Sequence, residues 1–218
     1  MGKTAIILGA TGLTGGILLN KLLLDERYTS IKVFGRSSTG KKHKKLSEFI
    51  CDLLDPETYQ NDFMGDEVYC CIGTTASKTP NKELYRKIDY GIPVSVAKLC
   101  HKKGIDTLLV VSAMGANKNS TVFYNRIKGE MEQDVLKQKV KRTYLIQPAL
   151  IGGERDEKRI LEWIFKKLFT VLNFILVGSL KKYRSIEPTV IANAMIKLAN
   201  SDKKTRRIPS DLLAEIGK

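Results

Sequence analysis

The sequence predicts an α/β protein of the Rossmann type, with a doubly wound parallel sheet in the strand order 3-2-1-4-5-6. An apolar run at residues 6–8 meets a turn with glycines at positions 9, 12 and 15, and a leucine-rich helical pattern follows. Further along, apolar runs of strand length alternate with helical segments, as in a parallel sheet with right-handed crossovers. Because 218 residues suffice for one such unit, we expect a single domain over residues 1–218.

The remaining elements follow in order from the apolar pattern. Strands are expected at residues 31–34, 49–51, 68–72, 107–111 and 143–146, and helices at residues 81–103, 122–138 and 189–199. The first of these helices is expected to bend near Pro93, because proline lacks the N–H that an interior helical position donates. Residues 107–111 are apolar throughout, as in a strand that is covered on both faces. The tail at residues 201–218 reads as polar, with a short apolar patch at Leu212 and Leu213.

A small helical extension is expected after the sixth strand, within residues 151–200. Residues 160–177 are rich in Ile, Leu, Phe and Trp but include Glu162, Lys166, Lys167 and Asn173, so they are a poor candidate for a membrane span. We interpret them as one or two amphipathic helices that cover the sheet edge or a substrate cleft. Since the segment is basic, peripheral contact with a membrane surface stays open as the weaker alternative.

The glycine turn predicts a diphosphate site. Gly9 would allow the tight turn, Gly12 would let the backbone approach a pyrophosphate, and Gly15 would let the helix pack closely on the sheet. The first N–H groups of a helix lack internal partners, and the helix dipole adds positive potential there. The residues expected to contact the cofactor here are Gly9, Thr11, Gly12, Leu13, Thr14 and Gly15.

Composition limits the other classes of function. The chain has 37 Lys and Arg against 23 Asp and Glu, a formal net charge of +14, which favours anionic partners. No nucleic-acid motif accompanies this charge, so we interpret it as a lysine-rich surface and expect no nucleic-acid partner. The four cysteines lack metal-ligand spacing, and no export signal precedes the first strand. We therefore expect reduced thiols, no metal site and a cytoplasmic protein.

The segment after the second strand favours NADP(H) over NAD(H). An NAD site commonly places a carboxylate there, which binds the ribose 2′-hydroxyl. This chain has Arg36 and Ser37 instead, and no acidic residue. A guanidinium forms two parallel hydrogen bonds to a phosphate, so we expect Arg36 and Ser37 to face the 2′-phosphate. The alternative is that Arg36 is a solvated loop cation.

Three residues could carry proton chemistry. Tyr124 and Lys128 are four positions apart on a predicted helix, so their side chains share one face. A neighbouring ammonium favours the phenolate and lowers the pKa of a tyrosine, which can then exchange protons with a carbonyl or an alcohol. Ser112 follows the fifth strand, at the sheet edge where open α/β sheets bind ligands.

Together these motifs resemble the Tat-interactive-protein family of atypical short-chain dehydrogenases/reductases. The stretches that carry the resemblance are residues 70–75, 88–90, 112–117, 123–130 and 216–218, besides the glycine turn. The resemblance covers essentially the whole chain and implies a Rossmann fold, an NADP cofactor and a Ser/Tyr/Lys constellation. One departure is Ala113, which follows Ser112 where relatives often carry a second serine.

The resemblance also implies roles for individual residues. Ser112 would hydrogen-bond the substrate oxygen, Tyr124 would exchange the proton, and Lys128 would hold the nicotinamide ribose and lower the pKa of Tyr124. The residues expected to flank the nicotinamide half are Gly73, Thr74, Pro148 and Leu150, and those expected to meet the adenine are Asp52 and Leu53. The small-molecule carbonyl or alcohol substrate is left unnamed, and both a monomer and a homodimer stay open.

Two other classes of function fit parts of this pattern. A cofactor-binding module that senses NADPH without turnover would have the same glycine turn. A nucleotide-sugar epimerase would share both the glycines and the Tyr/Lys spacing, but only about seventy residues follow the sixth strand, which is little for a sugar-nucleotide domain. Retention of Ser112, Tyr124 and Lys128 together favours the oxidoreductase.

Overall fold

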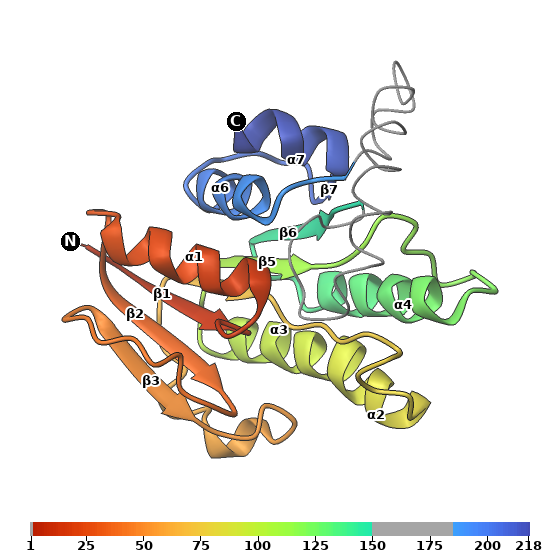
Figure 1. The fold of residues 1–218 in the computed structure, drawn as a ribbon, viewed down its shortest axis with the longest axis horizontal. Helices are drawn as coiled ribbons and strands as arrows, with labels where there is room; N and C mark the ends of the chain where they lie inside the picture. The colour runs from red at the N-terminus through yellow and green to blue at the C-terminus, as the bar shows by residue number, and fades with distance from the viewer. Residues whose placement is uncertain (1, 150–184) are drawn as a thin grey trace, which may run out of the picture.

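A computed structural model describes residues 2–149 and 185–218, and its strands form one parallel sheet in the order β3-β2-β1-β4-β5-β6-β7 (Figure 1). The predicted order is confirmed, with one strand added beyond β6. The strands are β1 (Lys3–Leu8), β2 (Tyr28–Gly35), β3 (Leu46–Ile50), β4 (Glu67–Cys70), β5 (Thr107–Val111), β6 (Arg142–Gln147) and β7 (Arg207–Pro209). Since β1 continues to β2 on one side and pairs with β4 on the other, the order reverses between β1 and β4.

Helices cover both faces of the sheet (Figure 1). One layer holds α1 (Leu13–Leu24), α6 (Pro188–Ala199) and α7 (Ser210–Gly217), and the other holds α2 (Lys82–Arg86), α3 (Ile92–Lys102) and α4 (Phe123–Lys137); a short 3-10 turn spans Pro56–Thr58. Each layer encloses its own apolar core. The leucines predicted to face the sheet from α1 are buried there, and Leu18, Leu19 and Leu22 are fully buried.

The tail was expected to be polar apart from Leu212 and Leu213, and the pattern predicted neither of the two elements that its second half forms. There β7 pairs with β6 in parallel, with Ile208 beside Ile146, and α7 follows directly. Ile208 and Leu213 are fully buried. A three-residue strand is too short to show an alternating pattern, and α7 becomes stable only by packing on α6, so neither element has a clear local signal.

The long helix predicted at residues 81–103 is divided by a π-helical turn, Lys87–Gly91, between α2 and α3. The irregularity therefore precedes Pro93, which lies in the first turn of α3. The π turn carries Asp89, whose side chain is completely buried. Such turns are rare and frequently occur at functional sites.

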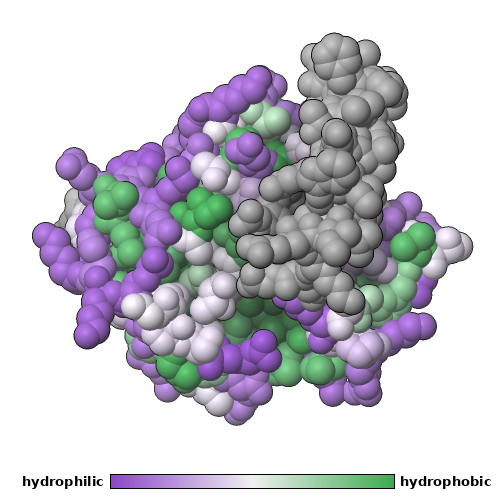
Figure 2. All heavy atoms as spheres, in the orientation of Figure 1, coloured by the Kyte–Doolittle hydropathy of each residue, from purple (hydrophilic) through white to green (hydrophobic). Residues whose placement is uncertain are grey.

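The other boundaries differ from the predictions by a few residues, and α4 lies within the helix predicted at residues 122–138. The apolar segment at residues 160–177 lies outside the described residues. Within the described ranges, no helix combines the length and apolar character needed to cross a bilayer. Figure 2 shows hydrophilic side chains over much of the visible face and a hollow lined by hydrophobic residues near its centre.

Candidate functional site

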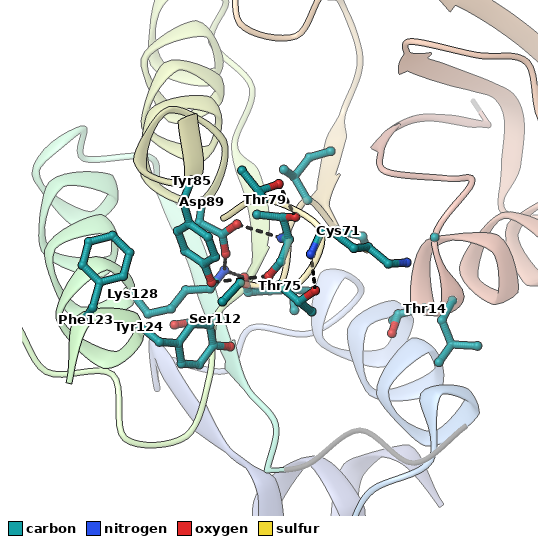
Figure 3. A pocket seen from close by; sticks show the side chains of 18 of the residues that line it. Thr14, Cys71, Thr75, Thr79, Tyr85, Asp89, Ser112, Phe123, Tyr124 and Lys128 are labelled. Atoms are coloured by element: carbon teal, nitrogen blue, oxygen red, sulfur yellow. Dashed lines mark hydrogen bonds and ion pairs between the residues drawn. The ribbon is translucent and has the colours of Figure 1, made fainter. Parts of the chain in front are cut away.

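A cavity of about 850 Å³ opens at the carboxyl edge of the sheet, next to the point where the strand order reverses. Open α/β sheets bind their ligands at this point, and the volume is typical of small-molecule sites. Among the described residues, its walls come from the loops after β1, β4 and β5 and from the start of α4. Figure 3 shows Ser112, Tyr124 and Lys128 grouped on one wall, with Thr14 on the facing side.

The glycine turn after β1 has the geometry that the sequence predicts. Gly9 adopts a φ of +85°, in the left-handed region that favours glycine, and its carbonyl accepts a hydrogen bond from the Gly12 N–H at 3.0 Å. A Cβ added at Gly15 would lie 2.1 Å from the Gly9 carbonyl oxygen. The turn therefore allows α1 to begin in direct contact with the backbone of the preceding loop.

Replacing Gly15 by alanine is expected to destabilise the protein by about 1–3 kcal/mol, since overpacked positions typically cost this much, and to weaken the binding of a dinucleotide at this turn. Urea unfolding and calorimetry would measure the two effects. Gly16→Ala is the matched control, because a Cβ there would lie 3.3 Å from the nearest atom, the Ala10 carbonyl oxygen. Equal behaviour of the two variants would contradict the close-packing role of Gly15.

The first turn of α1 is suited to an anion. Gly12 is its N-cap, no side chain caps it, and no acidic residue lies in its first turn. The N–H groups of Leu13 and Thr14 lie too early in the helix for internal partners, so they are available to an incoming acceptor. Thr11, Gly12, Leu13 and Thr14 all line the cavity. These residues fit the diphosphate of a dinucleotide.

The three residues predicted to carry proton chemistry lie in this cavity. Ser112 and Lys128 are each 3% exposed, whereas Tyr124 is 39% exposed at the first turn of α4. The Lys128 ammonium also donates a hydrogen bond to the Val111 carbonyl at 3.4 Å, which ties α4 to the end of β5. The structure thus brings Ser112, Tyr124 and Lys128 together as predicted.

Lys128 has a buried counter-charge. Its Nζ lies 2.8 Å from Oδ1 of Asp89, and the two side chains are 3% and 1% exposed. Burial, the largest single influence, would lower the pKa of Lys128, but Asp89 together with Tyr124 and Cys70 outweighs it, so the pKa of Lys128 is raised above its ordinary value. The lysine therefore stays an ammonium in the cavity wall throughout the neutral range.

Asp89 also fixes the loop after β4. Its Oδ2 accepts the Thr74 N–H at 2.8 Å, and the Thr74 carbonyl in turn accepts a hydrogen bond from the Tyr85 hydroxyl at 3.3 Å. Gly73 and Thr74 line the cavity as predicted. Sequence reasoning assigned Asp89 no role, although it lies in one of the stretches that carry the family resemblance, because its partners are far away along the chain.

Glu132 is the second residue that sequence reasoning missed. It lies one turn after Lys128 on α4, is 1% exposed and accepts the Ser112 hydroxyl at 2.6 Å. The spacing of Lys128 and Glu132, four residues apart on one helix face, could have indicated it.

Several predicted cofactor residues lie away from this cavity. Arg36 and Ser37 are exposed just after β2, whose last residues run beside the end of β1. Asp52 accepts the Leu54 N–H, and Leu53 is buried in the apolar core on the α3 side of the sheet, which leaves little of its side chain for an adenine. Pro148 is buried and its carbonyl accepts the Met114 N–H, and Leu150 lies outside the described residues.

The fold and the glycine turn define a nucleotide-binding Rossmann protein, and comparison with known proteins identifies the family. A family profile described as NAD(P)H-binding matches residues 9–149. Protein FMP52, mitochondrial, of Debaryomyces hansenii is 32% identical over 75% of this chain and 74% of its own length. Protein HTATIP2 of Rattus norvegicus is 29% identical over 77% of this chain and 70% of its own. The chain belongs to this NAD(P)H-binding family, as the resemblance to Tat-interactive proteins indicated.

Solved structures share the fold at low sequence identity. UDP-glucose 4-epimerase of Thermotoga maritima, with UDP-glucose, has a TM-score of 0.68 at 16% identity and covers 94% of this chain and 75% of that one. The Bordetella bronchiseptica enzyme WbmG, in complex with NAD, has a TM-score of 0.62 at 17% identity and covers 78% of this chain. This chain spans 61% of WbmG. Because both structures are less than 20% identical in sequence, these similarities establish the Rossmann fold and nothing finer.

Proposed function

We propose that the protein is an NADP(H)-dependent oxidoreductase of the atypical short-chain dehydrogenase/reductase type, acting on a small carbonyl or alcohol compound. One observation carries the proposal. Ser112, Tyr124 and the buried Lys128 line the same cavity as the uncapped first turn of α1. A proton-transferring group and a diphosphate site are thus brought within reach of one ligand.

Each residue has a role in this reaction. NADPH, when bound, supplies a hydride to the carbonyl carbon. Tyr124 donates a proton to the carbonyl oxygen, and the Lys128 ammonium stabilises the phenolate that remains. Asp89 fixes that ammonium in the wall of the cavity, 2.8 Å away. Ser112 positions the oxygen of the ligand, and the start of α1 holds the diphosphate.

Turnover separates this enzyme from a cofactor-sensing module. The purified protein would be loaded with NADPH, and the loss of reduced cofactor would be followed with a panel of aldehydes and ketones. Substrate-dependent oxidation of NADPH supports the proposal. Tight cofactor binding without oxidation across the panel would favour the sensing module instead. An epimerase would also leave NADPH unoxidised across this panel, so it would be recognised separately, by conversion of an added sugar nucleotide into its epimer.

Arg36 is expected to set the preference for NADPH over NADH. Its guanidinium follows β2 with no carboxylate nearby in sequence, beside the strand that leads into the glycine turn. Calorimetry should show tighter binding of NADPH, and Arg36→Ala should remove about 1.5–3 kcal/mol of that binding, as for a hydrogen bond to a charged group, while NADH affinity is unchanged. Lys42→Ala, in the nearby lysine cluster, serves as the charge control. Equal affinity of the unmodified protein for both cofactors would refute the assignment.

We propose a cytoplasmic location. Some relatives are named as mitochondrial proteins, so a mitochondrial location is the alternative to be tested. We also propose that the substrate is a small molecule and that the protein is a monomer or a homodimer. In the two described stretches, no three side chains of His, Cys, Asp or Glu gather closely enough to hold a metal ion. Microscopy of the tagged full-length chain and light scattering would test location and assembly.

A further inference from the structure

The Glu132 carboxylate lies behind Ser112 and accepts hydrogen bonds from three different elements. Its Oε1 accepts the Ser112 hydroxyl at 2.6 Å and the Gln147 amide at 2.7 Å. Its Oε2 accepts the Arg207 guanidinium at 2.8 Å, from β7. Glu132 is 1% exposed, and these donors come from the loop after β5, from β6 and from β7. A buried carboxylate with three donors is held in one orientation.

This arrangement determines which way the Ser112 hydroxyl can hydrogen-bond. A serine hydroxyl has one proton to donate and two lone pairs to accept, whereas a carboxylate paired with a guanidinium only accepts. The proton of Ser112 is therefore directed to Glu132. Because Ser112 also lines the cavity, it presents lone pairs to whatever binds there. A ligand atom that meets Ser112 must then be a hydrogen-bond donor.

We infer that Glu132 is a positioning residue that makes Ser112 a hydrogen-bond acceptor toward the cavity, so that the site holds the alcohol member of its substrate couple more tightly than the carbonyl member. The inference rests on the proposed function and specifies which member of the alcohol and carbonyl pair the site binds more tightly. An alcohol O–H donates to the Ser112 lone pairs. A carbonyl oxygen only accepts, so it meets no donor at Ser112 unless the serine gives up its bond to Glu132.

Changing Glu132 to glutamine should reverse the direction of the Ser112 hydrogen bond while the side chain keeps nearly the same shape. The side-chain amide of the variant can direct its oxygen to Arg207 and its NH₂ to Ser112, which releases the serine proton toward the cavity. Gln147 adapts by presenting its carbonyl oxygen in place of its NH₂. The variant therefore separates the charge and donor pattern of Glu132 from its volume.

The test uses complexes in which no hydride can move. Cyclohexanol is titrated into the protein saturated with NADPH, cyclohexanone into the protein saturated with NADP⁺, and both affinities are followed by ligand-observed NMR. Each variant is compared with the unmodified protein for the same ligand and cofactor. Ser112→Ala should weaken cyclohexanol by about three- to tenfold, the range for one neutral hydrogen bond, and leave cyclohexanone within about twofold.

Glu132→Gln should weaken cyclohexanol and tighten cyclohexanone, whereas a purely structural role would weaken both. Glu130→Gln is the matched control: it removes the same charge from α4, but its partner is Arg86, and both affinities should stay unchanged. Should Glu132→Gln fail to fold, Ser112→Ala decides alone. Cyclohexanone weakened as much as cyclohexanol in Ser112→Ala would overturn the inference. Absence of NADP(H) binding by the unmodified protein would instead overturn the proposed function.

Discussion

Replacing Tyr124 by phenylalanine is expected to lower kcat for carbonyl reduction by about 10²–10⁴-fold, the usual contribution of a positioned general acid. The phenyl ring has the same size at the first turn of α4, where Tyr124 is 39% exposed, and removes the proposed proton donor. NADPH affinity should change little, because the start of α1 on the facing wall is proposed to hold the diphosphate. Stopped-flow measurement of NADPH oxidation and calorimetry on the same samples would separate the two quantities.

Two comparisons make this result specific to proton transfer. Tyr85→Phe removes a hydroxyl from the same cavity, but one that is buried and hydrogen-bonded to the Thr74 carbonyl, so it should lower kcat far less. Lys128→Ala should damage both turnover and cofactor binding, since Lys128 is also expected to contact the ribose. Unchanged turnover in Tyr124→Phe would rule out Tyr124 as the acid.

Replacing Asp89 by asparagine is expected to destabilise the folded protein by about 3–5 kcal/mol, because removing one partner of a buried ion pair leaves the other charge uncompensated. Lys128 would then remain 3% exposed with no carboxylate at 2.8 Å. The asparagine carbonyl can still accept the Thr74 N–H, so the loss is chiefly that of the charge. Urea unfolding at neutral pH, analysed at constant m-value, would measure it.

The pH dependence should change sign between the two proteins. In the unmodified protein the pKa of Lys128 is raised, so the stability from its ammonium is fully present below the ordinary lysine pKa and is lost as pH rises through the higher folded value. In Asp89→Asn, the main group that opposes burial is lost, and burial should then lower the pKa of Lys128. The unfolded state then binds more protons, so stability should rise with pH from neutral to about 10.

The surface pair of Glu83 and Lys87 is the control for these measurements. Both side chains are well exposed, so Glu83→Gln should change stability little and without a comparable pH slope. In the double variant Asp89→Asn, Lys128→Met, no buried charge remains, and much of the lost stability should return. A small effect of Asp89→Asn at neutral pH would show that water reaches the pair.

Local patterns predicted most of the fold, because the predicted strands are rich in apolar residues and each long helix has a buried stripe. The glycine turn was predictable in detail, since the φ of Gly9 and the contact of Gly15 with the Gly9 carbonyl are local properties. The strand β7 was not, because three residues give no period and its stability comes from pairing with β6.

The site was predictable only where its residues are near one another in sequence. Tyr124 and Lys128 share a helix face, and Ser112 ends a recognisable strand. The position of Asp89 in the site depends on a π turn, which has no signal in the amino-acid composition, and on its ion pair with Lys128 from a different helix. A sequence pattern contains spacing but not the long-range pairing that makes a buried carboxylate stable.

The last strand of the sheet has a consequence for synthesis of the chain. Arg207 on β7 belongs to the polar cluster behind Ser112, and β7 follows every other strand in the chain. On the ribosome, strands β1 to β6 and the glycine turn emerge first, and chains generally fold from the N-terminal side. We therefore expect a nascent chain to form the hydrogen bonds around Glu132 late, after α6 has emerged and covered the apolar face of α1.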